Sequence, residues 1–447
     1  MSVNLEYQQD MNFRIDSNHR KNGLIELDRP PITETAVLVR LALPADSAQE
    51  VEESLAEMRR LAWTAGANVV ETFVQRRTKP CPATLIGLGK ASHVAEVCRE
   101  TDADLAIFDS DLTPAQGAKL QDILGVKVVD RTQLILDIFA QRARTNEGKH
   151  QVELAQLQYT LPRLRGRGIE MMQQTGGIGT RGPGEQKLEV DRRVIRRRID
   201  RLRVELDNIR RSRRIQRKRR GESAAATVAL VGYTNAGKSS LLNALTGADA
   251  FVENKLFATL DPCSRRCTLP SGREIVITDT VGFIRKLPHD LVAAFRATLE
   301  EINEANVILL VADAAHPAVD EHINVVNDVL SEILDEPKPT LKILNKTDIA
   351  EPGSVLRLCN GRDRSIAVSA RTGAGLEPLL NLLERELAPN WSRVRLRIPQ
   401  SAAGVVAQIY EGGRVLNRRY EDQEIVLDAE IGPDLQGKMA AYIAPGK

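Results

Sequence analysis

The chain has 447 residues, of which 42% are hydrophobic, and its formal net charge is +2 at pH 7. This composition excludes a disordered or fibrous chain, and the length predicts a globular protein of about three domains. No apolar stretch approaches the roughly 20 residues of a membrane span, so membrane insertion is not expected. The five cysteines are odd in number and scattered, which argues against a disulfide framework and favours a cytoplasmic protein, with peripheral association with a membrane left open.

Residues 1–34 are polar and lack the apolar core of a signal peptide, so we expect a flexible extension there. Residues 35–142 alternate apolar runs with amphipathic stretches, which predicts a small α/β domain with a parallel sheet. Strands are expected at 35–43, 68–74, 105–109 and 126–129. One helix is expected to end at Ala65, a second to follow Ala91 and a third to follow Thr113.

Within this domain, Gly87-Leu88-Gly89-Lys90 is similar to part of a nucleotide-binding loop. A tight turn before a helix is the simpler interpretation, and a second nucleotide site is the alternative. The alternative would make the chain an ATP-dependent RNA remodeller, with the nucleotide motif described below in a regulatory role.

Residues 143–222 carry a strong positive charge. From Arg192 to Arg220 there are fifteen Arg or Lys residues and three acidic ones, a pattern that is often only a solvated helix face. Here, however, apolar residues recur at alternating spacings of four and three, which predicts a helix with a packed seam. The seam residues are Ile195, Ile199, Leu202, Leu206 and Ile209.

The preceding segment shows the same spacing, at Leu154, Leu157, Leu161 and Leu164. Pro162 should end or kink that helix, because proline lacks the backbone N–H that a helix interior needs. We therefore expect the two segments to form an antiparallel helical hairpin.

The hairpin loop is rich in glycine and arginine. Such a loop forms no core, and arginine on a pliable backbone suits phosphates and folded RNA, so we predict RNA binding, with a simple linker as the alternative. The candidate RNA-binding residues are Arg163, Arg165, Arg167, Gly176, Gly177, Gly179, Arg181, Gly182, Gly184, Arg192, Arg193, Arg196 and Arg197.

Residues 232–239 fit the P-loop pattern, between an apolar run at 227–231 that predicts a strand and a stretch at 240–245 that predicts a helix. Gly232 and Gly237 would let the backbone wrap phosphates, and Lys238 would place a positive charge at the β and γ phosphates. Ser239 is the expected Mg²⁺ ligand.

A second apolar run at 274–278 ends in Asp279-Thr280-Val281-Gly282. Asp279 can hold Mg²⁺ through a water, and the Gly282 N–H can contact the γ phosphate. Thr259 is the candidate switch threonine that closes over Mg²⁺. We therefore predict Lys238, Thr259 and Gly282 as the catalytic residues.

Strands predicted at 306–311 and 340–344 lead to Asn345-Lys346-Thr347-Asp348. The Asp348 carboxylate can accept two hydrogen bonds from guanine, which adenine cannot donate, so this motif predicts GTP as the substrate. The remaining candidate GTP-binding residues are Tyr233, Thr234, Asn235, Ala236, Ser240, Phe257, Ala258, Leu260, Asp261, Ser369, Ala370 and Arg371.

After Pro389, short strands are predicted at 394–398 and 424–429, and the structure of 405–410 is left open. This tail predicts a small appended domain.

Together these motifs resemble the HflX family of bacterial ribosome-associated GTPases. The stretches that carry the resemblance are 176–184, Glu185 with Asp191-Arg192-Arg193, 233–235, 257–261 and 279–283. The resemblance implies an α/β fold with an N-terminal α/β domain (35–142), a helical hairpin (143–222), a Ras-like G domain with a parallel-rich sheet (223–390) and a small C-terminal α/β domain (391–447).

The resemblance also implies a monomer that binds the large ribosomal subunit and its ribosomal RNA, and that splits stalled or idle 70S ribosomes with GTP and Mg²⁺ under stress such as heat. Asn235 resembles the P-loop asparagine of potassium-dependent relatives, which suggests K⁺ as a further cofactor. A role in assembly of the large subunit is the alternative.

Phe283 stands where many small GTPases place a glutamine that orients the attacking water. The residue that orients water is therefore open, and we expect slow intrinsic hydrolysis that ribosomes stimulate.

Overall fold

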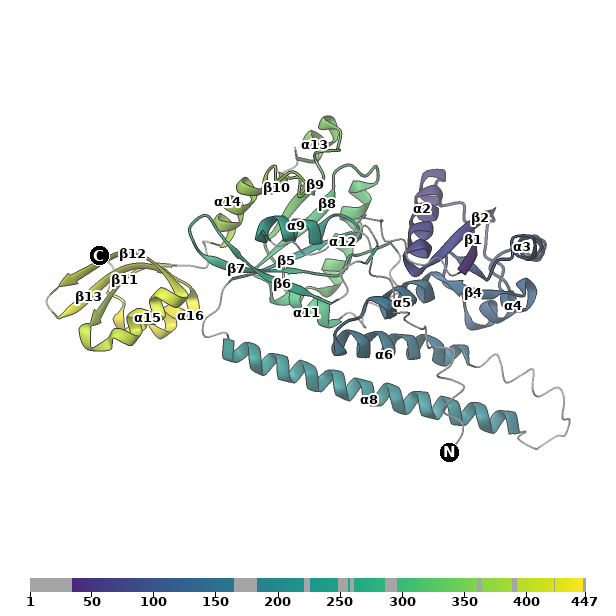
Figure 1. The fold of residues 1–447 in the computed structure, drawn as a ribbon, viewed down its shortest axis with the longest axis horizontal. Helices are drawn as coiled ribbons and strands as arrows, with labels where there is room; N and C mark the ends of the chain where they lie inside the picture. Colours follow the sequence, from purple (N-terminus) through teal and green to yellow (C-terminus); the bar gives the residue numbers. More distant parts are fainter. Residues whose placement is uncertain are drawn as a thin grey trace, which may run out of the picture.

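The structure is a computed structural model that describes residues 34–164, 183–220, 226–247, 256–257, 261–285, 296–359, 364–387, 392–421 and 423–444. Figure 1 shows an N-terminal sheet domain, a central sheet domain and a C-terminal domain in a row, with two helices running below the first two. The fold is mixed α/β with parallel-rich sheets, as predicted. No helix in the described ranges is long and apolar enough to cross a bilayer.

The N-terminal domain is a parallel sheet in the order β2-β1-β3-β4. Helices α2 and α5 cover one face and helices α3 and α4 cover the other, so the central strand β1 is buried almost throughout. The elements are β1 (Glu34–Ala42), α2 (Ala48–Ala65), β2 (Ala67–Arg76), α3 (Leu88–Glu100), β3 (Leu105–Phe108), α4 (Pro114–Leu124), β4 (Lys127–Asp130) and α5 (Arg131–Arg142).

Helix α3 begins earlier than predicted. Gly87 is its N-cap, in extended backbone with φ of −68°, so Leu88, Gly89 and Lys90 form the first helical turn. The Lys90 ammonium lies 4.9 Å from the centre of the Phe73 ring. These residues therefore form the N-cap and first turn of α3, and the second nucleotide site stays a prediction.

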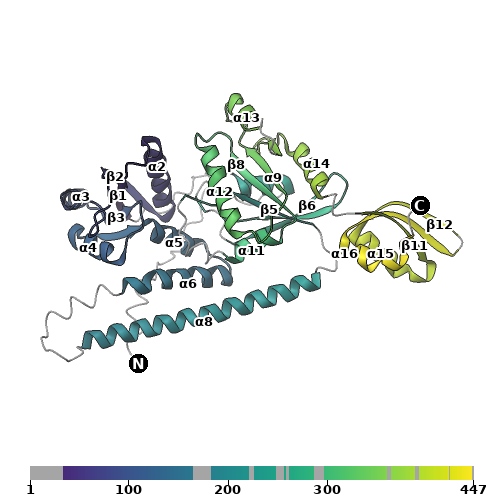
Figure 2. The ribbon, with the colours of Figure 1, turned by 180° about the vertical axis from the view of Figure 1, so that it is seen from behind.

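Helices α6 (Asn146–Arg163) and α8 (Pro183–Arg220) run antiparallel, with α6 between α8 and the two sheet domains (Figure 2). Along the predicted seam of α8, Ile199, Leu202 and Leu206 are buried. The Arg198 guanidinium donates to both carboxylate oxygens of Glu153 on α6, at 2.6 and 2.7 Å.

Helix α6 ends one residue after Pro162, as a proline in that place predicts. Its buried residues include Val152 and Ala155, which belong to the core shared with α5, whereas Leu154, Leu157 and Leu161 are only half-buried. The helix therefore packs on both α5 and α8.

The central domain has a six-stranded sheet in the order β10-β9-β8-β5-β7-β6, parallel except for the edge strand β6. Its strands are β5 (Ala226–Gly232), β6 (Cys263–Thr268), β7 (Glu274–Asp279), β8 (Val307–Asp313), β9 (Thr340–Asn345) and β10 (Ser365–Ala367). Its helices are α9 (Lys238–Thr246), α11 (Arg296–Glu304), α12 (Val319–Ile333), α13 (Pro352–Cys359) and α14 (Leu376–Leu387).

The C-terminal domain has an antiparallel sheet in the order β11-β13-β12. Residues 405–410, left open above, lie in helix α15, where Val406 and Ile409 are buried three residues apart, a helical spacing. Strand β12 was not predicted, because its mostly exposed, arginine-rich sequence lacks the alternation of a half-buried strand. The elements are β11 (Ser392–Pro399), α15 (Ala403–Gly412), β12 (Gly413–Glu421), β13 (Glu424–Ile431) and α16 (Pro433–Lys438), with short 3-10 turns at Gln400–Ala402 and Ala440–Tyr442.

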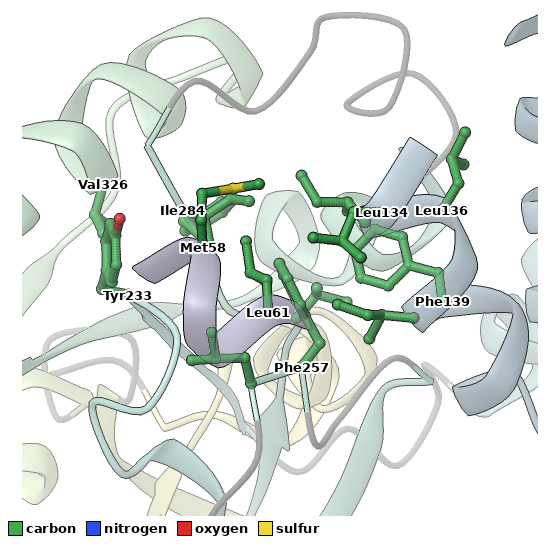
Figure 3. Packing of buried hydrophobic residues seen from close by; sticks show 14 of the residues in the cluster. Met58, Leu61, Leu134, Leu136, Phe139, Tyr233, Phe257, Ile284 and Val326 are labelled. Atoms are coloured by element: carbon green, nitrogen blue, oxygen red, sulfur yellow. The ribbon is translucent and has the colours of Figure 1, made fainter. Parts of the chain in front are cut away.

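One apolar core joins the N-terminal and central domains (Figure 3). Met58 and Leu61 of α2 and Phe139 of α5 meet Phe257 and Ile284 of the central domain. The Phe139 and Phe257 rings are 4.7 Å apart and nearly perpendicular, a favourable edge-to-face contact. The two domains therefore share buried surface rather than hang from a free linker.

Candidate nucleotide-binding site

The loop between β5 and α9 is shaped by two glycines. Gly237 is the N-cap of α9, with φ of 91°, and a Cβ there would clash with the side-chain amide of Asn345. A Cβ at Gly232 would clash with the carbonyl oxygen of Val311 on β8. Asn235 also has a positive φ, of 61°. The backbone thus turns tightly into α9, and the first N–H groups of a helix are donors that suit an anion such as phosphate.

The Lys238 ammonium lies inside this loop and is buried. It donates hydrogen bonds to the carbonyl oxygens of Gly232 and Tyr233, at 3.1 and 3.0 Å. Burial lowers the pKa of Lys238 to about 8, although Asp279 nearby acts in the opposite direction. An anionic phosphate beside the ammonium would restore its charged form.

The Ser239 hydroxyl donates to a carboxylate oxygen of Asp279 at 2.6 Å. Ser239 lies in the first turn of α9 and Asp279 ends β7, so the fold brings two oxygen ligands from separate motifs together. Hydroxyl and carboxylate oxygens are the ligands that Mg²⁺ prefers. These two residues therefore fit a Mg²⁺ site.

The segment after β7 lies directly against the loop. Phe283 N–H donates to the Gly232 carbonyl at 3.1 Å, and Thr234 N–H donates to the Phe283 carbonyl at 2.8 Å. Gly282, the residue before Phe283, lies very close to the P-loop. A Cβ there would lie 2.8 Å from Thr234 Cγ2 and 3.0 Å from Lys238 Nζ. Only a glycine leaves room for a phosphate contact at this point.

The motif at 345–348 meets the other end of the loop. The Asn345 side-chain amide donates to the Ala236 carbonyl at 2.9 Å, and its oxygen accepts from Ala370 N–H at 3.1 Å. The Ser369 hydroxyl donates to the Asp348 carboxylate at 2.7 Å. Three predicted groups, the P-loop, residues 345–348 and residues 369–370, are therefore brought together.

Other candidates take supporting places. The Lys346 ammonium donates to the carbonyl of Asn235 at 2.8 Å and to Asp313 at 2.7 Å. The Thr347 hydroxyl donates to the Val368 carbonyl at 2.9 Å, and the Thr280 hydroxyl donates to the Leu230 carbonyl at 2.7 Å. Both hydroxyls therefore stabilise the fold. The remaining candidates are Ser240 in α9, buried Val281, and Arg371, whose guanidinium lies 3.9 Å from Asp348.

Thr259, with Ala258 and Leu260, lies outside the described residues. On either side of this stretch, Phe257 packs against Phe139, and Asp261 bonds to the start of α6. The Asp261 carboxylate accepts from the N–H groups of Arg144 and Thr145, each at 2.9 Å, and from the Thr145 hydroxyl. Phe257 thus contacts α5 of the N-terminal domain, and Asp261 contacts the base of the hairpin.

Sequence reasoning missed a polar group that links the P-loop to the N-terminal domain. The Tyr233 ring stacks on His322 at 3.7 Å, and its hydroxyl donates to Glu57 of α2 and accepts from Arg285 N–H at 2.9 Å. Burial, with His316 nearby, lowers the pKa of His322 to about 3, so this ring is neutral.

Arg285 and Arg131 complete this link. Arg285 forms ion pairs with Glu321 at 2.6 Å, and with Glu53 and Glu50 of α2 at 3.5 and 3.6 Å. The Arg131 guanidinium donates to the Arg285 carbonyl at 3.1 Å. Burial lowers the pKa of Arg131 to about 10, so it stays charged at neutral pH. No local motif could reveal these contacts, since they join segments that are far apart in sequence.

The predicted RNA-binding residues are only partly described. Arg163 is used within the protein: it donates to the Leu112 carbonyl and Asp130, at 2.8 and 3.0 Å, and stacks on the Tyr159 ring. Arg193, Arg196 and Arg197 are exposed on α8, and Arg192 lies 3.7 Å from Glu189. Gly184 lies in α8, and Arg165, Arg167, Gly176, Gly177, Gly179, Arg181 and Gly182 lie outside the described residues.

Four family models match successive parts of the chain. They are described as "GTP-binding GTPase N-terminal" (52–140), "GTP-binding GTPase Middle Region" (142–220), "50S ribosome-binding GTPase" (227–346) and "HflX C-terminal domain" (354–439). A GTPase HflX of Caldanaerobacter subterraneus is 47% identical over 410 residues, which cover 92% of this chain and 94% of the relative. The chain belongs to the HflX family of GTPases.

The GTPase HflX of Escherichia coli is 43% identical over 386 residues, covering 86% of this chain and 90% of the relative. The chain is also similar to a GTP-binding protein from Sulfolobus solfataricus, whose crystal structure was solved in complex with GDP. The two sequences are 26% identical, the match covers 79% of this chain and 98% of the Sulfolobus chain, and the TM-score is 0.43. As an HflX GTPase, the chain hydrolyses GTP to GDP and phosphate.

Proposed function

We propose that this HflX GTPase binds the large ribosomal subunit through its basic hairpin, and uses GTP to split or rescue stalled or idle 70S ribosomes under stress such as heat. The observation that carries the proposal is the helix α8, which bears fifteen Arg or Lys residues between 192 and 220. Ribosomal RNA is a dense array of phosphates, and such a helix suits it. The match of the central domain to a ribosome-binding GTPase model supports the same partner.

The site residues would share the work of hydrolysis. The Lys238 ammonium would neutralise charge on the β and γ phosphates, and the Gly282 N–H would contact the γ phosphate. Asp348, aligned by the Ser369 hydroxyl, would accept hydrogen bonds from guanine. Ser239 and Asp279, with Thr259, would hold Mg²⁺, which neutralises charge that develops between the β and γ phosphates.

Asp261 supplies a route from the nucleotide to the hairpin. It belongs to the segment predicted to close on GTP, and its carboxylate bonds to the first residues of α6. A change in this segment would therefore act on the base of the helix that packs against α8. In this way the terminal phosphate of GTP would govern the RNA-binding arm.

Asn235 supports a further proposal, that K⁺ assists hydrolysis. The residue is exposed at the P-loop with a left-handed backbone, where its amide oxygen can reach a bound cation. Hydrolysis should be faster in K⁺ than in Na⁺ buffer, and equal rates would contradict this role.

Light scattering of 70S ribosomes tests the proposal. The protein should separate the subunits with GTP, and also with a non-hydrolysable analogue, because binding in the triphosphate state is the driving step. With the analogue, the protein should stay on the large subunit and fail to recycle. An unchanged scattering signal with both nucleotides would contradict splitting, and binding to immature large subunits alone would favour a role in assembly.

A further inference from the structure

Thr234 lies where the P-loop faces the residue that senses the γ phosphate. Its neighbour Tyr233 has its ring against His322, whereas the Thr234 methyl faces Gly282. A Cβ at Gly282 would lie 2.8 Å from Thr234 Cγ2, 2.9 Å from Thr234 Cα and 3.0 Å from Lys238 Nζ. Thr234, Gly282 and Lys238 therefore surround one small volume.

The hydroxyl of Thr234 has no role in the fold. The residue is 7% exposed, and its Oγ1 has no hydrogen-bond partner among the described residues. Nearby buried threonines differ, since the Thr280 hydroxyl donates to the Leu230 carbonyl at 2.7 Å and that of Thr278 bonds to Ser264 at 2.9 Å. Burying a hydroxyl without a partner is unfavourable, and valine would fill the same space without that penalty.

Phe283 offers no polar side chain for the reaction. Its ring is 3% exposed, within the core shared by the two domains, and its backbone pairs with Gly232 and Thr234. The Thr234 hydroxyl, by contrast, is polar and is carried on the same Cβ as the methyl that faces Gly282, the residue predicted to contact the γ phosphate.

We propose that Thr234 is a catalytic residue whose hydroxyl orients the water that attacks the γ phosphate. Oγ1 would accept a hydrogen bond from that water, and its O–H would donate a hydrogen bond to a γ-phosphate oxygen. The water oxygen bonds to the γ phosphorus as the bond to the bridging oxygen breaks, and GDP leaves with that electron pair. The proton lost by the water ends on the phosphate product, so threonine keeps its proton.

Single-turnover GTP hydrolysis by the full-length chain, with Mg²⁺ and without ribosomes, tests this role. Thr234→Val keeps the shape and removes the hydroxyl, so the hydrolysis rate should fall roughly 10- to 100-fold, as expected for loss of one hydrogen bond to a charged transition state. GDP affinity should stay within about threefold, because the contact is with the water and the γ phosphate. Thr234→Ser restores the hydroxyl and should keep most of the rate.

Thr278→Val is the control, because it also removes a buried threonine hydroxyl from the central domain, on strand β7, and its hydrolysis rate should not change. The thermal midpoint of Thr234→Val should equal or exceed that of the parent, which separates lost catalysis from lost folding. A parental rate in Thr234→Val would overturn the proposal. So would equal losses of rate and GDP affinity, or a Thr234→Ser variant as slow as the valine variant.

Discussion

At the scale of single residues, the P-loop lysine has a pKa well below its ordinary value. Lys238 is buried, and its ammonium donates to the backbone carbonyls of Gly232 and Tyr233. Burial lowers its pKa from 10.5 to about 8. At pH 8 the lysine of the nucleotide-free protein is therefore half-protonated, whereas phosphate binding needs the charged form.

This shift predicts that GDP binding takes up protons. At pH 8 binding should absorb about half a proton, and at pH 7 about one tenth, because the lysine is already charged below its pKa. GDP affinity should accordingly weaken as the pH rises above about 8. Calorimetric titrations in two buffers with different heats of ionisation measure the uptake, and zero uptake at pH 8 would contradict the perturbed lysine.

At the scale of elements, the start of α6 is held by a residue from another domain. Thr145 is the N-cap of α6, and the Asp261 carboxylate accepts from the N–H groups of Arg144 and Thr145. Gly148, in the first turn, makes this approach feasible, because a Cβ there would clash with the Asp261 carboxylate. A carboxylate at a helix N-terminus is favourable both as a cap and toward the helix dipole.

Asp261→Ala should therefore speed amide hydrogen exchange of Arg144 and Thr145 by about 5- to 30-fold, the effect of losing about 1–2 kcal/mol of capping. Gly148→Ala should do the same, since its methyl displaces the carboxylate. The double variant should exchange no faster than the faster single variant, because both changes break one contact.

Gly117→Ala is the matched control for this pair. Gly117 lies inside α4 with open space at its Cβ, so alanine should stabilise α4 by roughly 0.5–1 kcal/mol and leave the α6 amides unchanged. Additive effects of Asp261→Ala and Gly148→Ala would show that the two residues act separately.

Elements that depend on residues close together in the chain could be predicted from the sequence, and contacts between distant segments could not. The P-loop, the parallel strands and the α8 seam were predictable, because each depends on spacing within a few residues. Helix α15 could not be predicted in this way, because Val405 and Val406 favour strands. Packing of these residues against the C-terminal sheet stabilises the helix instead. The contact of Tyr233 with Glu57 spans 176 positions, and that of Arg131 with Arg285 spans 154, so no pattern in the chain signals either.

At the scale of the whole molecule, the central domain contacts the N-terminal domain through a shared core and a rim of charge. Arg285, which is 24% exposed at its side chain, faces Glu50 and Glu53 of α2 and Glu321 of α12. It follows Gly282 and Phe283 closely in sequence, so the segment beside the P-loop is also part of the domain interface.

Arg285→Ala should lower the stability of the joined domains by about 1–3 kcal/mol, because three carboxylates lose their partner. Raising the salt concentration to about 1 M should narrow the difference from the parent, since salt screens ion pairs that are partly exposed. Scanning calorimetry measures both effects through the thermal midpoint.

Arg357→Ala provides the comparison, because Arg357 pairs with Asp320 at 3.0 Å and both side chains are exposed. Its stability should change by less than about 0.5 kcal/mol. If both variants showed the same small change, Arg285 would contribute nothing beyond an ordinary surface ion pair.

We infer that the terminal phosphate of GTP governs a basic arm that binds the large ribosomal subunit. The most direct measurement is the affinity of the full-length chain for purified large subunits, by co-sedimentation, with a non-hydrolysable GTP analogue and with GDP. Binding should be at least about tenfold tighter with the analogue, a coupling of about 1.4 kcal/mol. Affinities that agree within about twofold for the two nucleotides would contradict this coupling.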